Sequence, residues 1–169
     1  MRPEIMKQTA RRAFGRYTWL LFLALAGLSF GARSNASSSA ASIDACHLLT
    51  SGEIQQQLGV AMDQGRLQTT KSQASCDWTG LKPNDDAGVG VAVHDFDQSL
   101  WNSFTSLPKA KPVSGLGDAA FEHVPTTNTV MIKLGKYEID VGVVDFKMKN
   151  EQQIAAAKAL AALVVSRVH

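Results

Sequence analysis

Cysteine, aromatic residues and long apolar runs are all scarce in this chain. Its 169 residues include two cysteines, and aromatic residues make up 7% of the sequence. The apolar run from Tyr17 to Leu28 has only 12 residues, whereas a helix that crosses a bilayer needs about 20. A stable transmembrane helix is therefore not expected there. Five basic residues precede the run, and this order is typical of a secretory signal peptide.

The N-terminal segment predicts export. Small residues close to Gly31 and Ala36 allow cleavage after either residue, so we expect a signal peptide over residues 1–31. The pair Arg11-Arg12 resembles a twin-arginine signal, but the Leu-rich run favours the general secretory route. Residues 29–36 contain no cysteine that could carry a lipid. We expect the mature protein to be periplasmic or secreted, without a stable membrane anchor.

Basic residues are also scarce beyond the export segment. Residues 37–169 carry 11 Lys or Arg and 14 Asp or Glu, a formal net charge of −3. Because the lysines are scattered, neither a nucleic-acid backbone nor an anionic membrane surface is an expected partner. We interpret residues 32–42, which are rich in Ala and Ser, as a flexible leader. Residues 43–169 have a common size for one domain with one core.

The even cysteine count predicts a disulfide in an oxidising compartment. Cys46 and Cys76 are 30 residues apart, and the loop-closure entropy of such a crosslink contributes about 3.5 kcal/mol. A metal pair or a catalytic thiol is disfavoured in an exported chain. The neighbouring His47 does not make Cys46 a nucleophile, because adjacent side chains on a helix or strand point apart.

Capping and periodicity predict three helices. Thr50 and Glu53 form a capping box for a first helix that ends before Gly59. Asp97 can cap a second helix, which ends at Pro108. The apolar side expected for this second helix is Leu100, Trp101, Phe104 and Leu107. The caps expected for the third helix are Asn150 and Gln153. Its expected buried stripe is Ile154, Ala157, Leu160, Ala161, Val164 and Val168.

A hairpin is predicted at Gly135-Lys136. With these residues as a two-residue loop, the register pairs apolar residues on one face: Leu134 with Tyr137, Ile132 with Ile139 and Val130 with Val141. The same register places Lys133 opposite Glu138 on the other face, as a cross-strand pair of opposite charge.

The strand pattern predicts the fold class. Alternation indicates further strands over residues 66–72, 75–79, 88–95 and 119–123, and an extended connector over 108–112. Short turns imply antiparallel pairing. We predict an α+β fold, with an antiparallel sheet of about five to six strands and helices packed mostly on one face. A weak internal repeat is also visible, since residues 93–96 and 144–146 are similar and each precedes a helix.

The candidate functional residues are His94, Asp118 and His123. Residues 115–120 have the letters of a dinucleotide-binding fingerprint, but a proline and a hairpin follow where a helix is needed, so they read as a glycine turn before a strand. His94 and Asp95 face opposite sides of a strand, and no third ligand has metal-site spacing. We predict no catalytic residue, no metal and no cofactor.

Five short segments occur together: Asp44–Thr50, Glu53, Leu58-Gly59, Cys76–Trp78 and Gly115–Ala120. With their Cys-x-Leu-Leu-Thr and Cys-x-Trp patterns, they resemble a family of small exported bacterial proteins, many of them actinobacterial lipoproteins, that carry a domain of unknown function. The resemblance covers about residues 44–168. It implies an exported, disulfide-bonded, non-enzymatic domain and names no ligand. The lipid-bearing cysteine common in that family is missing here.

We therefore expect an exported soluble binding or interaction module without catalytic activity. One alternative is a small periplasmic hydrolase or metal-dependent enzyme that uses His94, His123 or Asp118. Another is an inhibitor or accessory subunit of an exported protein. A pocket in which His and acidic side chains converge would favour the enzyme. An apolar pocket between sheet and helices would favour a ligand carrier, and an exposed apolar patch would favour a protein that binds a protein partner.

Overall fold

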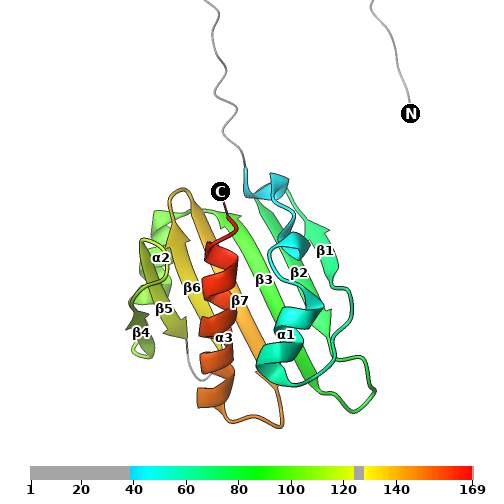
Figure 1. Cartoon of the computed structure of the whole chain (residues 1–169). Coiled ribbons are helices and arrows are strands. Elements are labelled where there is room, and N and C mark those ends of the chain that lie inside the picture. Colours follow the sequence, from blue (N-terminus) through cyan, green and yellow to red (C-terminus); the bar gives the residue numbers. More distant parts are fainter. Residues whose placement is uncertain (1–38, 124–127, 169) are drawn as a thin grey trace, which may run out of the picture. The chain divides into compact units, whose positions relative to one another are not determined.

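The computed structural model of the protein describes residues 39–123 and 128–168 (Figure 1). The signal peptide predicted over residues 1–31 and its cleavage sites lie outside the described residues. Among the described helices, none is both long and apolar enough to cross a membrane.

In the described part of the chain, seven antiparallel strands form one sheet, in the spatial order β1-β2-β3-β7-β6-β5-β4. Their bounds are β1 Arg66–Thr69, β2 Gln73–Thr79, β3 Ala87–Asp95, β4 Ala110–Val113, β5 Ala119–His123, β6 Thr129–Leu134 and β7 Tyr137–Asp145. The predicted α+β class with an antiparallel sheet is confirmed, but the predicted strand count is too low. The extra strand is β4, which lies where a connector was expected and pairs with β5 at the sheet edge. Pro112 is tolerated there, because an edge strand has N–H groups that no neighbour uses.

Helices lie on both faces of the sheet (Figure 1). Their bounds are α1 Ser51–Leu58, α2 Gln98–Thr105 and α3 Asn150–Val165, with the 3₁₀ turns η1 Ala40–Ser42 and η2 Ala45–His47 before them. We call the face beneath α1 and α3 the covered face, and the face that carries α2 the open face. α2 contacts the open face through Trp101, whose ring packs on that of Phe121 in β5 with a centroid distance of 5.5 Å.

The apolar side predicted for the second helix is not all buried, and α2 ends at Thr105, before Leu107 and the predicted end at Pro108. Trp101 is buried and its ring lies 5.9 Å from that of Phe96, but Leu100, Phe104 and Leu107 are exposed. The reason is that α2 meets the open face through Trp101, while the other apolar side chains have no further layer above them. These side chains consequently remain accessible beside the sheet.

Alternation along the central strands separates the two faces. The covered face holds the buried apolar side chains of β3, β6 and β7: Val89, Val91, Val93, Val130, Ile132, Ile139, Val141 and Val143. α3 packs on β7 and β6, and every member of its predicted stripe from Ile154 to Val168 is buried. The core therefore lies between the covered face and α3, and the open face over β2, β3 and β7 carries small and polar residues such as Ser75, Gly90 and Asp140.

The hairpin at Gly135-Lys136 has the predicted register. Every predicted cross-strand pair of β6 and β7 is present, including Lys133 opposite Glu138. Gly135 has a φ of 58°, a left-handed conformation that glycine adopts without the strain of a Cβ atom. The loop therefore sets which residues of β7 face the core and which face the groove described below.

The first helix cap is confirmed and the last is not. In α1, the Thr50 N–H donates to Glu53 Oε2 over 2.9 Å, and the Glu53 N–H donates to Thr50 Oγ1 over 3.3 Å. In α3, the N-cap is Lys149, whose N–H donates to Gln152 Oε1. Gln153 is buried instead, because it lies on the inner side of the helix, and its amide bonds the backbone that enters α3.

A disulfide and an ion pair fasten the N-terminal segment to the rest of the fold. The predicted bond between Cys46 and Cys76 is present, with a Cα–Cα distance of 5.1 Å, and joins η2 to β2. Arg167 pairs with Glu53 of α1 and donates to the Leu48 carbonyl over 2.8 Å. Hydrogen bonds from Arg167 lower the pKa of Glu53 to about 2, so the pair stays ionised across most of the acid range.

The chain from Ser39 to Ser42, which the sequence places in the leader, lies against the sheet. Ala40 is buried, and its N–H donates to Asp95 Oδ1 over 2.7 Å. The Asp95 carboxylate is thus engaged by η1 and points away from its neighbour His94, as alternation along a strand predicts.

Candidate functional site

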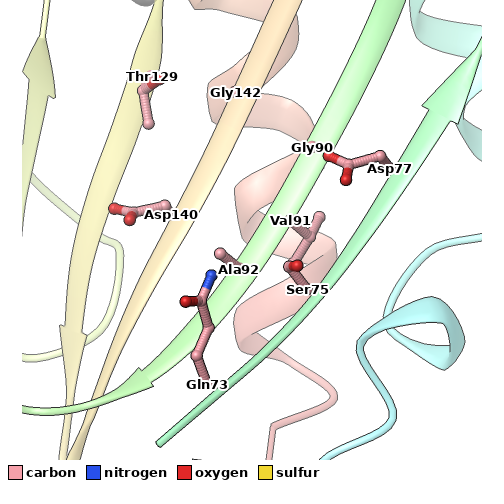
Figure 2. Close-up of a pocket in the computed structure, with 9 residues that line it drawn as sticks. All are labelled: Gln73, Ser75, Asp77, Gly90, Val91, Ala92, Thr129, Asp140 and Gly142. Carbon is pink, nitrogen blue, oxygen red and sulfur yellow. The ribbon is translucent and has the colours of Figure 1, made fainter. Parts of the chain in front are cut away.

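A groove runs along the open face over β2, β3, β7 and β6. Its centre is a depression of about 330 Å³ whose nine lining residues are drawn in Figure 2. The view looks onto the open face, with α3 behind the strands. Gln73, Ser75 and Asp77 lie along β2 on one side, and Thr129 and Asp140 lie on the other. The groove is therefore on the face that the main helices leave uncovered.

Glycine makes the floor of the groove. Gly90 of β3 and Gly142 of β7 are directly paired, and their outer neighbours are Asp77 on β2 and Thr129 on β6. A Cβ atom on Gly90 would lie 3.2 Å from Asp77 Oδ1, and one on Gly142 would lie 3.2 Å from Thr129 Oγ1. The two flanking side chains thus lean over the glycines, and any side chain on the floor would fill the space between them.

The groove extends from this centre in both directions along the strands. A depression of about 480 Å³ shares the glycine floor and reaches Val144. Another, of about 530 Å³, shares Asp140 and reaches α2 at Leu100 and Phe104. From Gly88 to His94, the strand β3 spans about 20 Å at about 3.4 Å per residue. A ligand several residues long could therefore lie extended on this face.

The lining is acidic. Among the described residues that line the three depressions there are five carboxylates, Asp77, Asp95, Asp97, Glu138 and Asp140, and no Lys or Arg. Asp95 bonds the backbone of η1, and Asp97 caps α2 by accepting from the backbone of its first turn. Asp77 accepts from Gln68 through Oδ2 over 3.2 Å, and Asp140 pairs with His94 through Oδ2. The oxygens that remain for a ligand therefore belong to Asp77, Glu138 and Asp140, each through its other acceptor atom or atoms.

Three titratable side chains converge at the α2 end of the groove. Nε2 of His94 lies 3.4 Å from Oδ2 of Asp140, and His94 is directly opposite Glu138 in the pairing of β3 with β7. The hydrogen bond to Asp140 raises the pKa of His94. Burial, followed by the negative charge of Asp140, raises the pKa of Glu138. The cluster thus brings one imidazole close to two carboxyl groups.

The two acids in this cluster keep unused acceptor atoms. Glu138 is only 6% exposed, and its Oε2 atom and Oδ1 of Asp140 are buried without a hydrogen-bond partner. The ammonium group of Lys133, opposite Glu138 in the register, lies instead 4.5 Å from the centre of the Phe96 ring. The predicted pairing is thus correct as a register, but the lysine rests on an aromatic ring.

The sequence candidates are dispersed. His94 belongs to the cluster, whereas Asp118 accepts a 2.7 Å hydrogen bond from the Gly135 N–H and serves the hairpin. The predicted glycine turn before a strand is confirmed, since Gly115 and Gly117 have positive φ angles and β5 begins at Ala119. His123 is the last residue of β5. Among the described contacts, none joins His94 to either of the other two candidates.

Glu138 and Asp140 were missed by reasoning from the sequence. Their spacing places both on the hairpin face opposite the core, and this signal was present in the predicted register. Their proximity to His94 depends on the pairing of β3 with β7, in which Val91 lies opposite Val141, 50 residues further on. No local pattern indicates a pairing over that separation.

The cluster is not arranged as a metal site: among residues 39–123 and 128–168, no group of three or more His, Cys, Asp or Glu side chains could hold a metal ion. Its chemistry is that of two carboxyl groups next to an imidazole, in a recess open to the groove. No protein-family model matches this chain, and no curated protein or solved structure matches it either.

Proposed function

We propose that this protein is an exported binding module whose open-face groove holds an extended, positively charged ligand, such as a lysine-rich peptide segment. The observation that supports this function is the lining of the groove, in which Asp77, Glu138 and Asp140 outnumber the single basic side chain, His94, and no Lys or Arg occurs among the described lining residues. Opposite charge across an interface promotes encounter and sets the register of the bound chain.

The shape of the groove suits an extended chain. The paired glycines Gly90 and Gly142 let a backbone approach the sheet closely. Exposed apolar side chains flank the acidic centre, with Val144 46% exposed at one end and Leu100 54% exposed at the other. Such side chains can pack against the methylene stems of lysines while the ammonium groups meet the carboxylates.

The first test fills the groove without removing any charge. Gly142→Val should weaken the binding of fluorescein-labelled hexalysine at least about tenfold in low-salt buffer, because the new side chain would occupy the floor beside Thr129. Fluorescence anisotropy measures the affinity. The melting temperature should hold, since a β-branched residue suits a strand.

Two controls accompany this measurement. Thr69→Val introduces the same side chain on β1, outside the groove residues, and should bind hexalysine like the wild type. Fluorescein-labelled hexaglutamate should not bind either protein. Equal affinity of the Gly142 variant and the wild type for hexalysine, or no binding by the wild type, would rule out this function.

A hydrolase is the second candidate, and the convergence of His94, Glu138 and Asp140 favours it. A carboxyl with a raised pKa beside a charged imidazole can serve as a general acid. His94→Gln separates the two functions. For a cation-binding groove, loss of the imidazolium should leave hexalysine binding unchanged or stronger. If the variant keeps its binding and melting temperature but no longer complements a strain that lacks the gene, catalysis is favoured.

A further inference from the structure

The recess at the α2 end of the groove has a carboxylate that the fold does not satisfy. Glu138 is more than nine-tenths buried, and its Oε2 atom has no hydrogen-bond partner. Burial of an unpartnered charged oxygen opposes folding, because the water that solvated it is not replaced. Oδ1 of Asp140, in the same recess, is also buried without a partner. The two residues that carry these acceptor atoms, Glu138 and Asp140, therefore line one depression of about 530 Å³.

The neighbouring groups compensate this negative charge only in part, because burial and the charge of Asp140 raise the pKa of Glu138 while the charge of His94 lowers it. The imidazole of His94 is directed to Oδ2 of Asp140, at 3.4 Å. Lys133 rests on the Phe96 ring, and Asp97 adds a further negative charge that raises the pKa of Glu138. Four groups therefore set the balance around Glu138, and the recess keeps an excess of acceptors and negative charge.

One wall of the recess is apolar. Phe96, Leu100 and Phe104 line it on the α2 side, and Phe104 is 37% exposed. The volume lies within the range of about 300–1,000 Å³ of small-molecule sites. A cation that fills this space therefore needs an apolar part as well as a charged end.

The positions of the free oxygens favour one kind of cation. They belong to two different carboxylates, Glu138 and Asp140, so they do not offer the single planar fork that a guanidinium uses. An ammonium group is a compact charge with three rotatable donors, and it can donate to two separate acceptors at once.

We infer that this recess binds a primary ammonium group on an apolar chain, with the ammonium donating to Glu138 and Asp140 and the chain packed on Leu100 and Phe104. This inference rests on the proposed function and specifies the charged group that the groove reads at one end. The ammonium can come from a lysine side chain of a bound peptide or from a free alkylamine.

Glu138→Gln is the central test, with hexylammonium chloride as the probe. The variant should bind the probe at least about tenfold more weakly than the wild type. The affinity is measured by NMR titration, from the shifts of the β7 amide signals. Hexanol and hexanoate, which keep the chain without the cation, should bind the wild type much more weakly. Glu151→Gln, an exposed change of the same kind on α3, should not alter binding.

The same variant should be more stable than the wild type, which distinguishes lost binding from unfolding. Because folding raises the pKa of Glu138, its ionisation destabilises the fold, and the wild type loses stability as the pH rises from about 4.5 through the raised value. His94, Asp97, Asp140 and Lys133 surround this group in both proteins. The variant should therefore melt several degrees higher at neutral pH, and the difference should shrink toward pH 4.5.

The outcomes separate this inference from the function on which it rests. Unchanged hexylammonium binding by the Glu138 variant, or equal binding of hexanol, would contradict the proposal that the recess binds an ammonium group. The proposal that the groove binds a cationic chain is tested separately, by the affinity of the Gly142→Val variant for hexalysine. Competition between hexylammonium and hexalysine supports a lysine side chain as the occupant. Simultaneous binding of both supports a free alkylamine.

Discussion

Ile139→Asp should lower the free energy of unfolding by about 4 kcal/mol or more, enough to unfold many domains of this size. Ile139 is fully buried on the covered face, between Val93 of β3 and Ile132 of β6. An aspartate there would be a buried carboxylate without a partner. Urea denaturation followed by circular dichroism measures the effect.

Lys133→Ala is the comparison on the opposite face of the same hairpin. Lys133 is partly exposed and contacts the Phe96 ring, and an exposed cation–π contact contributes about 0.5–1 kcal/mol. Its loss should therefore cost about 1 kcal/mol or less. A shift of the register by one residue would exchange the two faces, so equal melting temperatures for the two variants would contradict the register.

Removal of the disulfide is the second change with a large expected effect. The double variant Cys46→Ala and Cys76→Ala should lose about 3–4 kcal/mol of stability, because the unfolded chain regains the freedom of a 30-residue loop. The same loss should follow reduction of the wild type, measured by urea denaturation with and without dithiothreitol.

The double variant controls for other effects of the reductant. Because it has no disulfide, dithiothreitol should not change its stability. Thiol counting on the denatured, unreduced wild type should detect no free thiol. Two titratable thiols would contradict the bond and reopen the possibility of a reactive Cys46 beside His47.

The features that the sequence predicted correctly depend on residues close to one another along the chain. The capping box of Thr50 and Glu53 spans four residues, and the hairpin at Gly135-Lys136 aligns strands that follow each other directly. In such cases the side-chain pattern and the turn chemistry determine the structure locally. The disulfide needed one further premise, the oxidising compartment implied by the N-terminal segment.

The features that were missed depend on contacts between distant segments. β4 has four residues, among them Lys111 and Pro112, so its sequence resembles a linker. Pairing with β5 makes it a strand. α2 has a helical apolar pattern, but the pattern does not tell which of its side chains meets the sheet. His94 alone carried no signal of a site, because Glu138 and Asp140 approach it only through the β3–β7 pairing.

That pairing has a further consequence for how the chain acquires its structure. β1 to β3 and β4 to β7 are two meanders that meet only along the β3–β7 seam, in the middle of the sheet. Until β7 has been made and aligned, β3 is an edge strand with a row of valines, and such edges promote intermolecular pairing. The seam also gives the fold many non-local contacts, which slow folding. A chain of this kind is most vulnerable to aggregation between the synthesis of β3 and the arrival of β7.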